Sequence, residues 1–180
     1  PASKTPAPKG FKKALAVGRP PNVVKLFPHS QALIVSGKFI DRAMLMKGQS
    51  IAIAANGRNA FVIRGALRAA QKANAALIIE IAKSEGGQKA YCAVNYWNMA
   101  RIVDSLCNEM GITIPVAVHA DHYGMKNEKD LAQALVEVFD ALGVARRFGL
   151  DRAEFAVEPL HAGARLLGGL GRLADARFDV

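Results

Sequence analysis

Three short apolar segments alternate with segments of helical periodicity in the middle of the chain. The apolar segments are residues 51–55, 76–81 and 114–119, and the last is rich in β-branched residues. Short apolar runs of this kind are typical of strands that are buried on both faces. Because each predicted strand is followed by a predicted helix, the order indicates repeated βα units, a parallel sheet and right-handed crossovers.

The predicted helices have recognisable boundary residues. Residues 60–73 place apolar side chains at helical spacing and follow Asn59, a favourable N-cap residue. A second helix is predicted over residues 95–110, where Gly111 provides a common C-terminal stop. A third helix is predicted to begin near Asn127.

The first fifty residues lack this alternation, and we expect them to form an extension that packs against the main domain. Residues 1–10 are rich in proline and are predicted to form an arm. A short helix is predicted over residues 11–17, and a helical turn over residues 41–47, closed by Gly48.

The order of elements predicts an α/β fold but leaves its closure open. A (β/α)8 barrel and an open doubly wound sheet both begin with such units. A closed barrel typically needs about 250 residues, whereas this chain has 180. With three predicted units, the chain is too short to close a barrel by itself.

Polar residues with catalytic potential stand at the end of the third predicted strand. They are His119, Asp121 and His122, and ligands of α/β folds bind at such strand ends. In one interpretation His119 and Asp121 are hydrogen-bonded groups at a solvated strand end. In the other, His122 binds a metal ion and Asp121 transfers a proton. His119 and His122 are an odd number of residues apart, so they point to opposite faces unless the chain has turned.

The surrounding segment, Ile-Pro-Val-Ala-Val-His-Ala-Asp-His-Tyr-Gly at residues 114–124, resembles the zinc-dependent class II fructose-bisphosphate aldolases. In that family the corresponding strand ends in an Asp-His pair. The resemblance implies that Asp121 is the catalytic acid/base and that His122 is a ligand of Zn²⁺. It also implies a (β/α)8 TIM-barrel type of fold, of which this chain has an incomplete set of parallel strands.

Two further strand ends resemble the family. Asn56 follows Ile-Ala-Ala, like the asparagine that binds substrate after the family's first strand. Ser84 stands in Ser-Glu-Gly, like the serine that helps to bind a phosphate after the second strand, although its spacing from Asn56 is about two residues long. The resemblance therefore implies substrate-binding roles for Asn56 and Ser84.

The resemblance covers residues 51–143 and not the tail, residues 144–180. The family's zinc takes three histidines, two of them from the second half of the barrel. His161 is the only later histidine here, and its setting does not resemble either missing ligand segment. We therefore expect an extension at residues 1–50, the first βα units at 51–143 and a divergent tail. The chain alone is expected to bind zinc weakly and to have low activity, as a truncated relative would.

Composition and charge narrow the choice of partners. The net charge of +9 favours an anionic partner, either a phosphorylated metabolite or a nucleic acid. The basic residues are scattered, which argues against a nucleic-acid footprint. Cys92 and Cys107 lack CxxC spacing and are expected to be reduced. No apolar run approaches the roughly 20 residues of a membrane span, so we expect a cytoplasmic protein without a membrane partner.

The resemblance implies a carbon–carbon lyase of glycolysis and gluconeogenesis. The implied reaction is reversible aldol cleavage of a ketose bisphosphate, fructose 1,6-bisphosphate, to dihydroxyacetone phosphate and glyceraldehyde 3-phosphate. The alternatives are a phosphosugar-binding barrel protein without catalysis and a basic nucleic-acid-binding protein. Because a partial barrel leaves strand edges unpaired, we also expect a homo-oligomer, or a tail that covers the edge.

Overall fold

The computed structural model of the chain describes residues 7–87, 90–124 and 126–134. The end of the third predicted helix, the tail and His161 lie outside these residues. The described elements, in chain order, are α1 (Phe11–Gly18), α2 (Pro21–Leu26), α3 (Gly37–Lys47), β1 (Ile53–Asn56), α4 (Ala60–Ala73), β2 (Leu77–Ala82), α5 (Lys83–Gly86), α6 (Tyr96–Met110), β3 (Val116–Asp121) and α7 (Glu128–Ala134).

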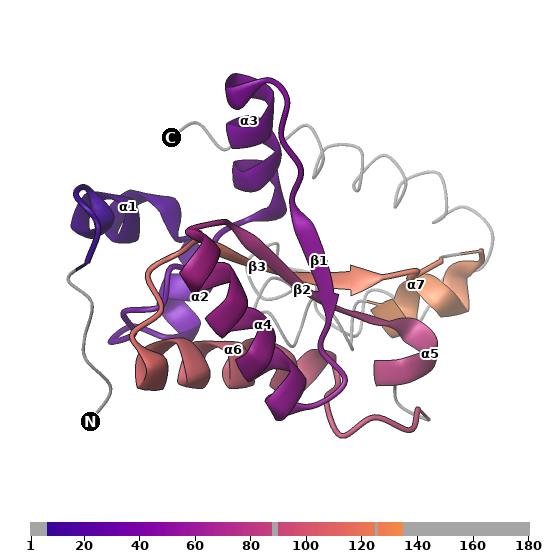
Figure 1. Cartoon of the computed structure of the whole chain (residues 1–180). Coiled ribbons are helices and arrows are strands. Elements are labelled where there is room, and N and C mark those ends of the chain that lie inside the picture. Colours follow the sequence, from indigo (N-terminus) through magenta and orange to yellow (C-terminus); the bar gives the residue numbers. More distant parts are fainter. Residues whose placement is uncertain (1–6, 88–89, 125, 135–180) are drawn as a thin grey trace.

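The three strands form one parallel sheet in the order β1-β2-β3, as the sequence pattern predicts (Figure 1). Helix α4 connects the first pair of strands, and α5 and α6 connect the second pair. These are three successive βα units, as in the first part of a (β/α) barrel.

Local capping explains why the helices begin and end where they do. The Asn59 side chain accepts hydrogen bonds from the backbone N–H groups of Phe61 and Val62, both at 3.0 Å, and so starts α4. Asn74 ends the helix in a left-handed conformation with φ of 49°. Gly111 ends α6 in the same way, with φ of 65°. These boundaries confirm the positions predicted for both helices.

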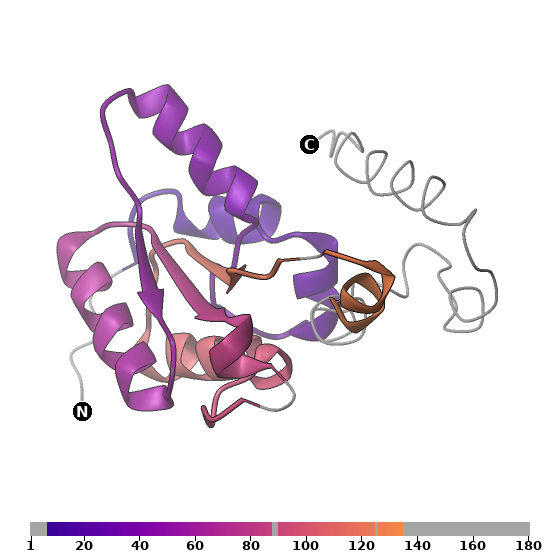
Figure 2. The same cartoon turned by 90° about the vertical axis from the view of Figure 1, so that its right-hand side faces the viewer.

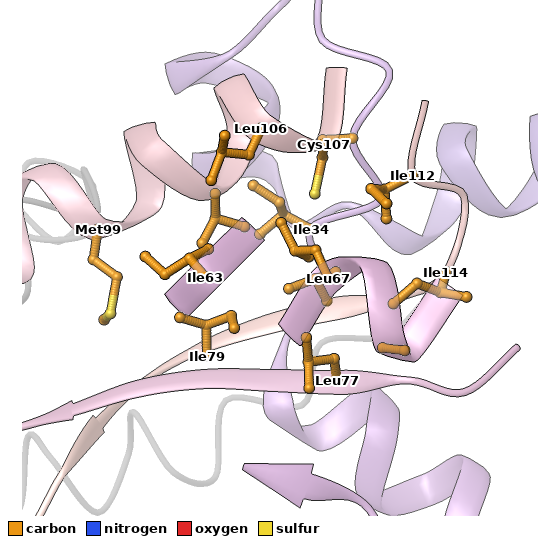
Figure 3. Packing of buried hydrophobic residues seen from close by; sticks show 14 of the residues in the cluster. Ile34, Ile63, Leu67, Leu77, Ile79, Met99, Leu106, Cys107, Ile112 and Ile114 are labelled. Carbon is orange, nitrogen blue, oxygen red and sulfur yellow. The ribbon is translucent and has the colours of Figure 1, made fainter. Parts of the chain in front are cut away.

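Helices α4 and α6 pack on one face of the sheet and enclose the main core (Figure 3). Along β2, buried side chains alternate with partly buried ones, because successive residues of a strand point to opposite faces. The buried set, which faces the helices, comprises Leu77, Ile79 and Ile81. The remaining residues of β2, including Glu80, therefore lie on the opposite face, which we call the inner face.

The N-terminal extension covers the amino-terminal half of the inner face. Leu33, Val35 and Ile40 are buried and pack in one cluster with Ala117 of β3 and Ile78 of β2. Figures 1 and 2 show α3 on the side of the sheet away from α4 and α6. The carboxyl-terminal half of the inner face keeps more exposed side chains, and the side chain of His119 there is 57% exposed.

Helix α3 is longer than the turn predicted at residues 41–47, because it begins at Gly37. Ser36 caps its first turn by accepting a hydrogen bond from the backbone N–H of Lys38 at 3.2 Å. Ile40 of this first turn is buried in the cluster beneath the helix. The burial of Ile40 and the Ser36 cap thus extend the helix toward its N-terminus, beyond the range that the sequence pattern predicted.

The extension also contacts the main domain through polar bonds to α6. The Ser30 hydroxyl donates to a carboxylate oxygen of Asp104 at 2.5 Å and accepts from the Asn108 side chain at 2.9 Å. The backbone N–H of Gln31 donates to Asn108 Oδ1 at 2.8 Å. These bonds fix residues 30–31 against the helix that covers the opposite face of the sheet.

Among the described residues, none of the helices has the length and apolar character that crossing a membrane would require.

The two cysteines, Cys92 and Cys107, are both free. Burial raises the pKa of the Cys107 thiol to about 12, which keeps that core cysteine in its unreactive thiol form.

Candidate active site

Parallel pairing places the polar strand ends side by side. Asn56 of β1 pairs in register with Glu80 of β2, and Glu80 pairs with His119 of β3. Asp121 lies two residues after His119, so both side chains share the inner face. The sheet therefore brings Asn56, Glu80, His119 and Asp121 to one face at its carboxyl edge, where parallel folds bind ligands.

Glu80, His119 and Asp121 form a compact polar cluster. His119 Nδ1 lies 3.0 Å from Glu80 Oε2. One ligand atom from each residue can be chosen so that all three lie within 4.8 Å of one another. Sequence reasoning did not predict a role for Glu80, and it gave His119 only as a hydrogen-bonded polar group at a solvated strand end. The spacing of His119 and Asp121, two residues apart on a strand, was the available signal for a shared face.

His122 lies just beyond the end of β3, where the chain has already turned. Its backbone has φ of 47°, the left-handed conformation that is uncommon for residues other than glycine. Its side chain is 86% exposed, and Nε2 lies 3.7 Å from Asp121 Oδ2. His122 is therefore a solvent-facing imidazole at the rim of the site, adjacent to Asp121.

Glu85 holds the end of β1 through a buried carboxylate. It accepts hydrogen bonds from Asn56 Nδ2 at 2.6 Å and from the Tyr91 hydroxyl at 3.2 Å, and it pairs with Arg58 at 2.5 Å. The hydrogen bond from Asn56 is the largest contribution that lowers the pKa of Glu85, followed by that from Arg58, while desolvation opposes both. The same carboxylate raises the pKa of Arg58.

This contact fixes the orientation of the Asn56 amide. A carboxylate accepts hydrogen bonds, so the NH₂ group of Asn56 must face Glu85. Asn56 Oδ1 is then directed elsewhere, and it is buried with no hydrogen-bond partner among the described residues. An unpaired buried acceptor is costly, and a ligand hydroxyl is one group that would satisfy it.

Ser84 lies in a different setting from the other three predicted site residues. Strand β2 ends at Ala82, and Ser84 follows in α5 with an exposed side chain. Ser84 thus lies two residues beyond the last residue of β2, which corresponds to the two-residue excess in its spacing from Asn56. Asn56 and Asp121 share the inner face, and His122 adjoins Asp121. Ser84 lies beyond the carboxyl end of β2, in α5.

Replacing Glu85 with glutamine is expected to lower the thermal unfolding midpoint at neutral pH, because Asn56 and Arg58 lose their anionic partner. The folded pKa of Glu85 is depressed, so its stabilisation is fully present above the unfolded pKa of about 4.3. That stabilisation is lost as the pH falls through the folded value. Thermal unfolding from pH 7 down to pH 3 should therefore show the variant and the unmodified chain converging below about pH 4.3.

Glu128→Gln is the matched control, since it removes one carboxylate from an exposed position in the first turn of α7. If both variants have the same unfolding midpoint at pH 7, Glu85 does not hold the end of β1.

The metal centre that the family resemblance implies fits the described residues only in part. A catalytic zinc normally takes three protein ligands, and the described residues place a carboxylate, Asp121, beside His122. The described donors that gather into a group of three are Glu80, His119 and Asp121, and His122 is not among them. One imidazole and two carboxylates are ligand types that suit a divalent metal ion.

Comparison with known proteins agrees with the parallel βα arrangement of the sheet. The family model of fructose-bisphosphate aldolase class-II matches residues 40–143, more than half of the 180 residues. This range contains all three described strands and the helices between them. No curated protein matches the chain. The sheet topology and the family match together identify the described strands as the first part of a (β/α) barrel, and the chain belongs to the class II fructose-bisphosphate aldolase family.

Proposed function

We propose that this chain takes part in aldol cleavage of a phosphorylated ketose, with fructose 1,6-bisphosphate as the substrate. The observation that carries the proposal is the shared inner face of Asn56 and Asp121 at the carboxyl edge of a sheet of this family. Cleavage yields dihydroxyacetone phosphate and glyceraldehyde 3-phosphate. The net charge of +9 favours the approach of such an anionic substrate.

Asp121 is the residue that we propose to move the proton. In the cleavage direction its carboxylate accepts the proton of the hydroxyl group on C4 while the C3–C4 bond breaks. The bonding electrons remain on the ketone-derived fragment, and the departing carbon becomes an aldehyde. In the reverse direction Asp121 returns the proton to the forming alkoxide.

The substrate-binding roles follow from the donors and acceptors that remain available. Because Glu85 occupies the NH₂ group of Asn56, the acceptor left without a partner is the buried Asn56 Oδ1. It would accept a hydrogen bond from a substrate hydroxyl once the side chains that cover it move aside. The exposed hydroxyl of Ser84 is assigned to a phosphate oxygen. A bound Zn²⁺ supplies Lewis-acid polarisation of the ketone, and His122 is the ligand that we assign to it.

The test is a coupled assay of the full chain with fructose 1,6-bisphosphate and added Zn²⁺. Asp121→Ala is expected to lower turnover by about 10²–10⁴-fold, the usual contribution of a general acid–base group. The control is Asp41→Ala, which removes an exposed carboxylate of α3, and it should keep the activity of the unmodified chain. Equal turnover by the Asp121 and Asp41 variants would contradict the assigned role.

A second candidate function is phosphosugar binding without cleavage. It is favoured by the 86% exposure of the His122 side chain, since catalytic zinc needs further protein ligands. This function predicts binding of fructose 1,6-bisphosphate in calorimetry, weakened by Asn56→Ala, together with an absence of product. Measured cleavage by the full chain would exclude it.

A further inference from the structure

We infer that Glu80, His119 and Asp121 form a divalent-cation site of their own on the inner face of the sheet, separate from an ion held by His122. The three residues come from two hydrogen-bonded strands, with Glu80 and His119 directly paired in register. Their ligand atoms lie within 4.8 Å of one another. Donors on the same face of paired strands are held by the sheet itself rather than by a mobile loop.

The chemistry of the three donors indicates the kind of ion. Imidazole nitrogen together with carboxylate oxygen suits Zn²⁺ and Co²⁺ rather than Mg²⁺ or Ca²⁺, which prefer oxygen ligands alone. Three protein ligands would leave one tetrahedral position for water or another small ligand. The expected occupant is therefore a divalent transition-metal ion with an open coordination position.

Charge and burial also favour a cation between these side chains. The side chains of Glu80 and Asp121 are 19% and 27% exposed, so both carboxylates are partly withdrawn from water. Two negative groups so close to one another repel, and a cation bound by both removes that repulsion. The Nδ1 atom of His119 already lies 3.0 Å from Glu80 Oε2. These two side chains therefore lose little conformational freedom when an ion binds.

The position of His122 separates this site from the expected zinc ligand. Its imidazole follows the end of the strand and faces solvent, with Nε2 3.7 Å from Asp121 Oδ2. If the proposed function is correct, an ion bound by Glu80, His119 and Asp121 occupies the same carboxylate that transfers the proton. A chain with this site filled therefore cannot use Asp121 as its acid–base group.

The test measures Co²⁺ binding to the full chain, because the visible absorption of Co²⁺ reports its ligands without any need for activity. His119→Ala and Glu80→Gln should each weaken Co²⁺ binding by about tenfold or more and should alter the visible spectrum. His29→Ala is the matched control, since it removes an exposed imidazole that lies outside the cluster, and it should leave this affinity and spectrum unchanged. Glu80→Gln keeps the size of the side chain, and far-ultraviolet circular dichroism verifies the fold of each variant.

Three results would overturn the inference. One is a lack of Co²⁺ binding by the unmodified chain, and another is undiminished binding by both the His119 and Glu80 variants. The third is a greater loss in His122→Ala than in His119→Ala, which would place the ion at the strand terminus. Because none of these measurements uses a sugar phosphate, the metal site can fail while aldol cleavage stands, and the reverse also holds.

Discussion

Replacing Ile79 with alanine is expected to lower the free energy of unfolding by about 2–5 kcal/mol, the range for large-to-small changes in a core. Ile79 lies in the middle of β2, the central strand, and is 0% exposed. It belongs to the core cluster shared with Ile63 and Leu67 of α4 and with Met99 of α6 (Figure 3). Truncation removes apolar contacts and leaves a cavity that the two helices fill only in part. Urea denaturation followed by circular dichroism measures the loss.

Ile53→Ala provides the matched control for this truncation. Ile53 has the same side chain and lies in the neighbouring strand β1, but it is 59% exposed. Its loss should cost less than about 1 kcal/mol, because little buried surface disappears. A similar cost for the two variants would mean that the core is not centred on β2.

Gly57→Ala is expected to lower the free energy of unfolding by about 1–3 kcal/mol, because it adds a methyl group where the packing has no room. A Cβ atom at this position would lie 2.9 Å from Ile79 Cγ2 and 3.2 Å from Ile63 Cγ1. The backbone cannot easily withdraw, since the N–H of Gly57 donates to the carbonyl of Glu80 at 2.7 Å. Asn56 precedes Gly57, so the same strain should also displace Asn56, for which a substrate-binding role is predicted.

A double variant tests the cause of that loss. Ile79→Ala removes the Cγ2 atom that the new methyl group would contact, so the combined variant should lose less stability than the sum of the two single changes. Gly65→Ala is the control, because a Cβ atom there has no neighbour within 4 Å. As a glycine-to-alanine change inside α4, it should be stabilising by about 0.5–1 kcal/mol. Strict additivity in the double variant would show that another contact causes the loss.

Local signals allowed α4 and α6 to be predicted from sequence almost residue by residue, whereas strand limits were less accurate. The third strand was predicted at residues 114–119, but β3 is Val116–Asp121. Pro115 has no N–H to donate to a sheet ladder, which explains the later start. The strand continues through His119 to Asp121 because β2 pairs with it as far as Ala82.

The candidate site was predictable only where its residues are adjacent in sequence or end successive strands. Asn56 and Asp121 could be placed at one edge because parallel strands share it. The pairing of Glu80 with His119 depends on the register of β2 against β3, which no local pattern specifies. The contact of Glu85 with Asn56 joins residues 29 positions apart and depends on how α5 folds back after β2.

The short parallel bridge between Ile34 and Val116 affects how the sheet could grow. Val116 donates its N–H to the Leu33 carbonyl at 3.0 Å and accepts from the Val35 N–H at 2.9 Å, at the edge of β3 away from β2. A further strand joining β3 there must displace a competitor tethered to the same chain, and tethering gives effective concentrations of the order of millimolar. Among the described residues, the bridge occupies this edge of β3 at Val116 and leaves the later residues of the strand uncovered. Another strand would therefore begin to pair with β3 next to His119 and Asp121.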